Sequence, residues 1–484
     1  MNSNLKKNLI YQTMYQILAI LLPLIISPYV SRVLGAENLG DYTYSFSIAE
    51  YFVLFAMLGI NNYGNRVIAV NRDNKDLLYK SFSSIFILHL FVAIIFTIIY
   101  YFYTFFFSNN VMLFFIQGLY VISSIVDVNW FFFGIENFKL SVVRNTLIKI
   151  STVLLIFIFV TDKQDIYIYA FIMALCSLSG NVIMFVCLPR YTKLVKVGVN
   201  DIIKHIKPLL ILFVPVIAIS LYKIMDRIMI GALVPKSQLG YYSNSEKAIN
   251  IPISIIGAFG TVMLPRMSNM LKRGINSESK KFVNNSVTCV MMLAVPLTFG
   301  LGAVSNCFAT VFWGEEFSDC GKIINCLSLS IPFLAFANVI RTQLLIPLSK
   351  DGEYIVSVFL GALVNVVVNF ILIPKYYAMG AAIGTVLAEA MVCITQTAYI
   401  RKEINVIKIL KNSMIYLLFG IAMYVFLLLL TSKMDYNIFS LIIQILVGAS
   451  IYIVLCFVYL WRTKSPYLVM LSSTVKKCVF NHYQ

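Results

Sequence analysis

The sequence predicts an all-α polytopic membrane protein, and its composition, its apolar runs and an internal repeat lead to this prediction. Of the 484 residues, 60% are hydrophobic and 12% are charged, whereas a soluble domain is about half apolar and about a quarter charged. The apolar residues form solid runs, most of them near the roughly 20 residues that a helix needs to cross a bilayer. A transmembrane β-barrel would instead need segments of alternating hydrophobicity.

Fourteen apolar runs predict about fourteen transmembrane helices. The run 147–161 is short for a span, and its ends are the least well defined. The predicted helices cover residues 11–33, 42–64, 82–105, 111–133, 147–161, 166–188, 209–231, 248–268, 287–313, 322–347, 354–373, 378–400, 411–431 and 437–461.

Two segments 200 residues apart share the pattern Leu-Gly-x-Tyr-x-x-Ser. They are residues 39–45 and 239–245, and each follows one apolar run and opens the next. Arg66 and Arg266 each stand 26 positions after the glycine. Matched order and spacing indicate an internal repeat, so we predict two parallel six-helix lobes. The domains would be the N-terminal lobe 1–205, the C-terminal lobe 206–405, and 406–484 with two extra helices and a tail.

The net charge of +17 follows the predicted topology. With fourteen helices both termini lie on one side, and that side collects 28 Lys and Arg residues against five on the other. The positive-inside rule therefore predicts a multi-pass protein with cytoplasmic N- and C-termini. Because the basic residues mark one face of the membrane, we expect the lipid bilayer as a partner and no nucleic acid.

The sequence contains no candidate residues for metal binding, nucleotide binding or catalysis. The nine cysteines lack CxxC spacing and lie mostly inside apolar runs, so neither a zinc site nor a disulfide framework is predicted. The pair Gly321-Lys322 has no glycine at the spacing of a phosphate-binding loop. We therefore expect a transporter, not an enzyme, with no catalytic residue, metal or cofactor, driven by an ion gradient, the membrane potential or substrate flux.

Ionisable residues within the apolar runs are the candidate functional residues, since a charge at the bilayer centre costs roughly 2.5–3.5 kcal/mol and needs a partner or a cavity. Lys223, Asp226 and Arg227 have the spacing of one helical face. There Asp226 would either leave one cation for an anion or close a helix end in a salt bridge. Arg32 ends the first run, where snorkelling is the alternative explanation. Arg341 lies inside a run and is the cation hardest to explain by topology.

Arg66 and Arg266 occupy matched places at the inner ends of their runs. Either the positive-inside rule alone explains them, or they face each other across a cleft that opens to the cytoplasm. Three acids are candidates for ion coupling or for pairing with the arginines: Glu50, Asp127 and Glu389.

A family likeness is carried by two stretches of the chain. Residues 22–42, LPLIISPYVSRVLGAENLGDY, followed by LGINNYGNR at 58–66, resemble the amino-terminal signature of Wzx-type polysaccharide flippases. Asp226 in DRIMIG, the second Leu-Gly-x-Tyr and Pro265-Arg266 resemble the matching second-lobe signature. The likeness extends over essentially the whole chain, and its motifs are moderately specific for the multidrug/oligosaccharidyl-lipid/polysaccharide (MOP) superfamily.

This resemblance implies two lobes around a central cavity that work by alternating access. The implied substrate is an undecaprenyl-pyrophosphate-linked oligosaccharide, turned from the cytoplasmic to the outer leaflet of the bacterial inner membrane for surface polysaccharide synthesis. A polysaccharide polymerase and glycosyltransferases are the further partners it implies. The substrate-binding role then falls on Arg32, Lys223, Arg227 and Arg341, with Arg66 and Arg266 as an inner gate.

Other functions stay open beside this one. A cation-coupled multidrug exporter of the same superfamily would favour acidic and aromatic cavity walls, and the likeness of the motifs argues against it. A flippase for the peptidoglycan lipid precursor is a sibling alternative. A membrane-embedded glycosyltransferase or polymerase would need carboxylates on a large outer loop, which the sequence lacks. Asn365 and Asn369 would either hydrogen-bond sugar hydroxyls or join helices.

Overall fold

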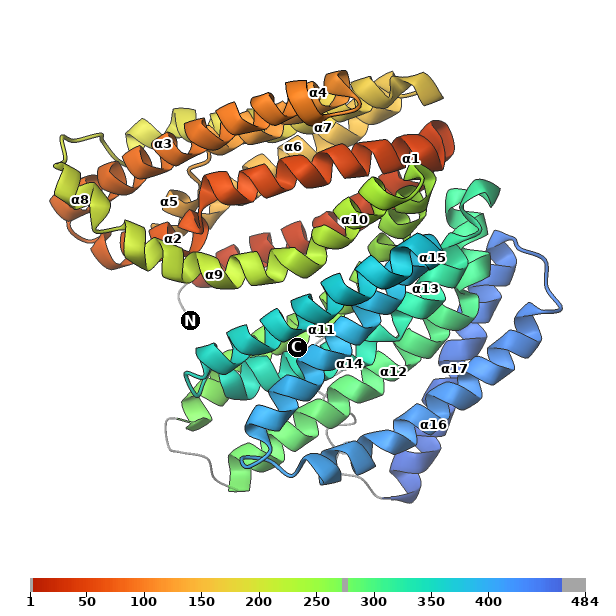
Figure 1. Cartoon of the computed structure of the whole chain (residues 1–484). Helices are drawn as coiled ribbons and strands as arrows, with labels where there is room; N and C mark the ends of the chain where they lie inside the picture. The colour runs from red at the N-terminus through yellow and green to blue at the C-terminus, as the bar shows by residue number, and fades with distance from the viewer. Residues whose placement is uncertain (1–2, 272–276, 464–484) are drawn as a thin grey trace. The chain divides into compact units, whose positions relative to one another are not determined.

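The computed structural model describes the backbone of residues 3–271 and 277–463 (Figure 1). Side chains are described from Leu22 onward within these ranges. The exceptions are the side chains of Phe138, Tyr222, Thr261, Val262, Pro265 and Arg266. Throughout the described ranges the regular elements are helices and no strand occurs, which confirms the all-α prediction.

The helices run almost without interruption along the described chain. They are α1 (Ser3–Met57), α2 (Ile60–Asn71), α3 (Lys75–Phe107), α4 (Val111–Ile125), α5 (Asn129–Gly134), α6 (Phe138–Phe159), α7 (Ile166–Cys187), α8 (Val199–Ile203), α9 (Ile206–Lys223), α10 (Met225–Leu233), α11 (Lys236–Leu271), α12 (Ser277–Trp313), α13 (Cys320–Ser328), α14 (Ser330–Ile340), α15 (Asp351–Ile400), α16 (Val406–Thr431) and α17 (Ile438–Arg462). The short segments are η1 (Lys163–Asp165), η2 (Leu188–Arg190) and η3 (Glu315–Phe317), which are 3₁₀-helical, and η4 (Arg341–Leu345), which is π-helical.

Eleven stretches of the described chain are long and apolar enough to cross a membrane. Two of them, Leu22–Asn71 and Asp351–Ile400, are 50 residues long and contain a break. α1 breaks at Gly35 (φ 77°, ψ 173°), and α15 breaks at Tyr377 (φ 52°, ψ −134°). The 36-residue helix α11 is more polar and falls outside the eleven. With both halves of each broken stretch and α11, the described residues contain the fourteen predicted spans.

The chain divides into two compact units. The first comprises the chain up to Asn244 together with Val358–Gly384, and the second comprises Ser245–Ser357 and the chain from Thr385 onward. The first unit therefore adds α9, α10, the first turns of α11 and part of α15 to the six N-terminal spans. The lobe boundaries at residues 205 and 405 stay a prediction.

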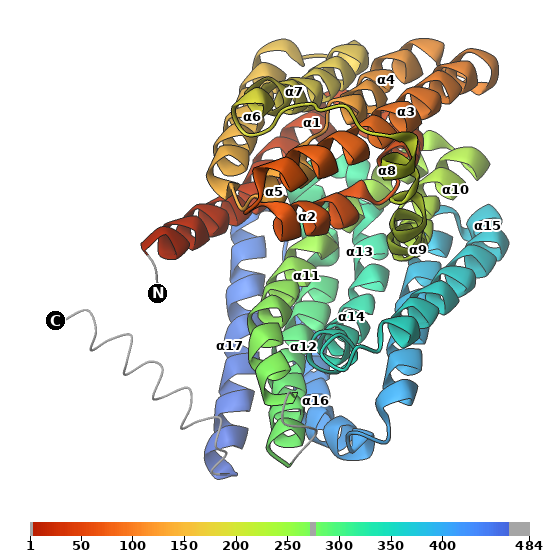
Figure 2. The ribbon, with the colours of Figure 1, turned by 90° about the vertical axis from the view of Figure 1, so that its left-hand side faces the viewer.

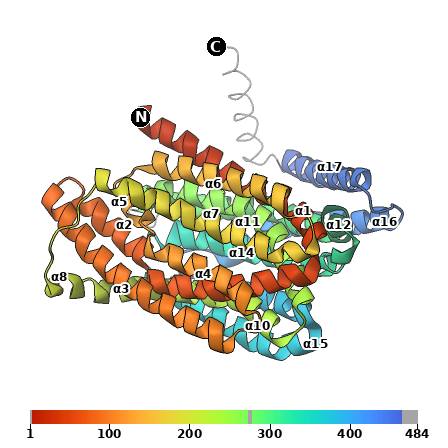
Figure 3. The same cartoon turned by 90° about the horizontal axis from the view of Figure 1, so that it is seen from above.

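In the first unit the long helices pack side by side, and α1 contacts α3, α4 and α6. Figure 3 shows α6 and α7 side by side in this bundle. The short helices α2, α5 and α8 lie at the end that the sequence predicts to be cytoplasmic, where α9 begins (Figure 2). The core there is built on Trp130, which is fully buried against Phe82 and Phe131. A Cβ added at Gly64 would lie 2.5 Å from the Trp130 ring, so glycine lets α2 approach it.

In the second unit α16 and α17 pack against α12. Val295, Tyr416 and Tyr452 belong to the core between these helices. The Tyr452 hydroxyl also donates a hydrogen bond to the Met292 carbonyl at 3.0 Å. The two C-terminal spans are thus fixed to the unit both by apolar packing and by this hydrogen bond.

Candidate functional site

Polar side chains in the first unit surround Asp226 of α10. Asp226 is 2% exposed, and two other helices supply donors to its carboxylate. The Tyr242 hydroxyl of α11 donates at 2.8 Å and the Asn369 amide of α15 donates at 2.6 Å. Asn369 also donates to the Asn365 side-chain oxygen at 3.3 Å. These bonds compensate for removing the carboxylate from water, and Asn369 therefore joins helices, one of its two predicted alternatives.

Arg227 follows Asp226 and pairs with Glu50 of α1. The Arg227 Nη1 and Glu50 Oε2 atoms are 3.7 Å apart, and the side chains are 23% and 40% exposed. This separation exceeds the roughly 2.7–2.9 Å of a charge-assisted hydrogen bond, so the contact is an ion pair without a direct hydrogen bond. The contact joins a predicted phosphate-binding cation to a predicted coupling acid, and the coupling role of Glu50 stays a prediction.

The predicted charged face of Lys223, Asp226 and Arg227 is not formed as one surface. α9 ends at Lys223 and α10 begins at Met225, so the helix is interrupted within the motif. Lys223 is exposed whereas Asp226 is buried. Residues three positions apart on one continuous helix would lie on the same face and be similarly exposed. Because Lys223 and Asp226 differ in exposure, Asp226 faces the helices that supply its donors and Lys223 faces away from them.

Arg32 and Asp127 also belong to the first unit. Arg32 is exposed, three residues before the break at Gly35. Asp127 lies between α4 and α5, where its Oδ1 atom accepts from the Asn129 backbone amide at 2.9 Å and from the Asn129 side chain at 2.7 Å. Such a carboxylate, bonded to the backbone two residues on, stabilises a turn. Asp127 thus fixes the turn that starts α5.

The second unit contains Arg341 and Glu389. Arg341 opens the π-helical segment η4, a type of distortion often found at functional sites. Its Nη2 atom donates to the Asn338 side-chain oxygen at 2.8 Å, and its guanidinium carbon lies 5.7 Å from the centroid of the Tyr354 ring. Glu389 is 6% exposed in α15. The side chain of Arg266 lies outside those the structure describes.

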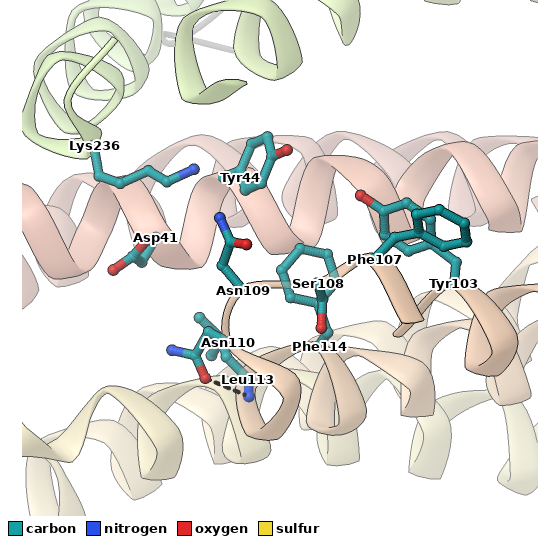
Figure 4. A pocket seen from close by; sticks show the side chains of 10 residues that line it. All are labelled: Asp41, Tyr44, Tyr103, Phe107, Ser108, Asn109, Asn110, Leu113, Phe114 and Lys236. Atoms are coloured by element: carbon teal, nitrogen blue, oxygen red, sulfur yellow. Dashed lines mark hydrogen bonds between the residues drawn. The ribbon is translucent and has the colours of Figure 1, made fainter. Parts of the chain in front are cut away.

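A small polar pocket lies at the predicted outer end of the first unit (Figure 4). In Figure 4 Lys236 of α11 points toward Tyr44 of α1, and Asp41 and Asn109 lie close by. The Lys236 ammonium is 3.3 Å from the centroid of the Tyr44 ring and donates to the Gly231 carbonyl at 2.5 Å. The cavity has about 40 Å³, enough for a few water molecules but far below the roughly 300–1,000 Å³ of ligand pockets. It therefore has no room for a sugar.

Composition and spacing did not predict this pocket, because in the sequence Lys236 is only one of the five basic residues on the outer side. The available signal was position, since Lys236 stands three residues before the second Leu-Gly-x-Tyr segment and Asp41 lies inside the first. In the part of the chain that the structure describes, no three His, Cys, Asp or Glu side chains gather in a metal-binding arrangement.

The helical architecture defines a polytopic membrane protein with a buried polar cluster in its first unit. The chain belongs to the polysaccharide biosynthesis protein family, whose model matches residues 5–271. It is 23% identical over 415 residues to a protein of Escherichia coli (strain K12) named as an O-antigen transporter, and this match covers 83% of the chain and 99% of that protein. It is also 23% identical over 410 residues to the capsular polysaccharide biosynthesis protein CapF of Staphylococcus aureus, with 82% and 99% covered.

Two solved structures share the fold. The lipid II flippase MurJ in an inward closed conformation superposes with a TM-score of 0.78 at 15% identity, over 94% of this chain and 99% of that one. An inward-facing multidrug resistance MATE transporter of the MOP superfamily gives a TM-score of 0.55 at 11% identity, over 79% and 94%. The chain therefore has the fold of these two membrane proteins.

Proposed function

We propose that the chain carries undecaprenyl-pyrophosphate-linked oligosaccharide repeat units from the cytoplasmic to the outer leaflet of a bacterial inner membrane. It would do so by alternating access, with both termini in the cytoplasm, and would supply a surface polysaccharide polymerase with repeat units made by glycosyltransferases. The observation that carries this proposal is membership of the polysaccharide biosynthesis protein family, supported by relatives matched over nearly their whole length.

Arg227 is the best-placed cation for the pyrophosphate. A guanidinium can bind two phosphate oxygens at once. Its pairing with Glu50 is 3.7 Å long, longer than a direct charge-assisted hydrogen bond, so a doubly charged pyrophosphate group can compete with the carboxylate. We assign Arg32, Lys223 and Arg341 to the same substrate at other stages of transport, because each lies in a helix that the sequence predicts to span the membrane.

Ion coupling falls on Glu50 and Glu389 in this proposal. We do not assign ion coupling to Asp127, because its side chain accepts two local hydrogen bonds in the turn before α5. A proton on Glu50 would remove its charge and weaken its hold on Arg227, so protonation and phosphate binding would favour each other. This is a coupling between two sites, and it acts in both directions.

Deletion of the gene tests the proposal. We expect lipid-linked repeat units to accumulate in the inner leaflet and surface polysaccharide to disappear, and both to be restored by the wild-type gene. Normal surface polysaccharide in a clean deletion, in a strain without a second flippase gene, would contradict the proposal.

The same strain separates the alternative functions. Increased sensitivity to cationic drugs with unchanged polysaccharide would indicate a multidrug exporter, and arrested cell-wall synthesis would indicate a peptidoglycan precursor flippase. Complementation with Arg341→Ala adds a test of the site. We expect that variant to insert at the wild-type level and to export poorly, whereas full export would remove Arg341 from the site.

A further inference from the structure

A groove lies between α2 and α9 at the predicted cytoplasmic end of the first unit, where the two helices run side by side (Figure 1). It encloses about 470 Å³, within the roughly 300–1,000 Å³ of ligand pockets. Its walls are apolar along one side of each helix. The apolar lining comes from Val67 and Val70 of α2 and from Pro208, Ile211 and Leu212 of α9.

A break in the backbone between α1 and α2 sets the direction of α2, and this direction places α2 beside α9 to form the groove. Leu58 and Gly59, between α1 and α2, both have positive φ angles, 43° and 76°. Phe213 of α9 packs against the break, since a Cβ added at Gly59 would lie 3.2 Å from its Cα and Cβ atoms. Gly59 tolerates both the left-handed backbone and this close approach. α2 therefore begins in contact with α9 and continues in a direction of its own.

Hydrogen bonds hold the groove in shape at both ends of α2. Near its start, the Tyr63 hydroxyl is 2.6 Å from Nδ1 of the buried His205, whose Nε2 is 2.8 Å from the Ser84 hydroxyl. At its end, the Asn71 amide donates to the Ser81 hydroxyl at 2.8 Å. Tyr63 and Asn71 both line the groove. A cavity that is already formed lowers the entropic cost of binding.

Arg66 gives the groove a positive charge. Its side chain is exposed and lines the cavity, and among the described residues no acid lies within ion-pair distance of it. Three other cations at this end are held in ion pairs. These pairs are Arg72 with Glu136 at 2.6 Å, and Lys80 and Lys204 with Asp201 at 2.9 and 3.0 Å. Arg66 is therefore available to bind an anion from outside the protein.

We infer that this groove binds the phosphorylated end of a single-chain polyprenyl lipid, the anchor of the transported substrate. The Arg66 guanidinium binds the phosphate, and the apolar walls hold the first part of the chain. One groove between two helices suits one chain better than the two chains of a phospholipid. The inference takes the identity of the lipid from the proposed function, and it gives Arg66 a binding role in place of the predicted gate.

Binding to the purified full-length protein tests the inference, with undecaprenyl monophosphate as the probe and native mass spectrometry as the readout. We expect Arg66→Ala to weaken binding about tenfold or more, because a charge-assisted bond is lost, and Ile211→Trp to weaken it by filling the groove. Arg72→Ala is the matched control, since it removes the same charge close by on a residue outside the groove. It should bind within about twofold of the wild type.

Two results would overturn the inference. One is equal binding by Arg66→Ala and the wild type. The other is competition by phosphatidylglycerol at the same concentration as the probe, which would show a general site for anionic lipids. If Ile211→Trp misfolds, Arg66→Ala still tests the inference, because Arg66 is exposed and does not contribute to core packing. If the groove variants weaken binding but the deletion strain makes normal polysaccharide, the lipid site is supported and the proposed function is wrong. If the deletion strain loses its polysaccharide but the groove variants bind like the wild type, the proposed function is supported and the lipid site is wrong.

Discussion

Gly40 of α1 and Gly240 of α11 form a reciprocal contact. A Cβ added at Gly40 would overlap the carbonyl oxygen of Lys236, and a Cβ added at Gly240 would overlap that of Ala36. Each glycine therefore touches the residue four positions before the other, and both pairs of equivalent positions are 200 residues apart. The two Leu-Gly-x-Tyr segments pack on each other with local two-fold symmetry, because small residues allow the two backbones to meet.

The first prediction concerns this contact. We expect Gly40→Ala and Gly240→Ala each to lower the melting temperature in detergent, because the added methyl group must push a backbone carbonyl away. Overpacking of this kind typically costs about 1–3 kcal/mol. Gly257→Ala in the same helix α11 is the control, since a Cβ there meets no atom within 4 Å. It should melt at or above the wild-type temperature, and wild-type melting of Gly40→Ala would contradict the contact.

Residue type and spacing alone predicted the spans, the repeat and the gaps in which α1 and α15 break, but not the residue at which each break occurs. The break at Gly35 falls at a glycine, which accepts a positive φ without strain. The break at Tyr377 has a φ of 52° on a residue that disfavours it. Pro374 stands three residues before Tyr377, in the gap between the predicted spans 354–373 and 378–400. No signal marks the tyrosine itself, so packing elsewhere in the chain must hold its conformation.

The sequence identified the charged residues of the candidate site but only some of the contacts between them. Glu50 and Arg227 were both identified because charges are costly inside a membrane, yet nothing in the sequence joins them across the 177 residues between their positions. The partner of Asp226 was expected three or four residues away, on its own helix. The structure shows donors from two other helices, Tyr242 and Asn369, 16 and 143 residues away, because an interruption of the helix places Asp226 on a different face from Lys223.

The second prediction concerns the hydrogen bond from Tyr242 to Asp226. We expect Tyr242→Phe to destabilise the protein by about 1.5–3 kcal/mol, because a buried carboxylate loses a donor. Thermal unfolding in detergent measures this effect. Tyr436→Phe is the control, since Tyr436 is 51% exposed and should lose little. Equal melting temperatures for the two variants would show that Asp226 does not depend on the tyrosine hydroxyl.

The third prediction concerns Arg227 and Glu50. If Arg227 binds the pyrophosphate, Arg227→Gln should reduce surface polysaccharide about tenfold or more in a complemented deletion strain, through loss of a charge-assisted contact. Glu50→Gln keeps the shape of the side chain and should retain more export than Arg227→Gln. Arg72→Gln removes a charge from another ion pair and should export normally. Wild-type export by Arg227→Gln would exclude this arginine from the site.

The fourth prediction concerns Gln343 in the π-helical segment η4. Its side chain is fully buried, and neither atom of its amide has a hydrogen-bond partner among the described residues. A polar group removed from water without a partner costs about 1–3 kcal/mol, so Gln343→Leu should raise the melting temperature. Gln396→Leu is the matched control, because Gln396 is buried in the same unit but donates to the Ser357 hydroxyl at 3.1 Å. That variant should melt lower. A lower melting temperature for Gln343→Leu would mean that its amide is satisfied after all, and that η4 needs a polar side chain at this position.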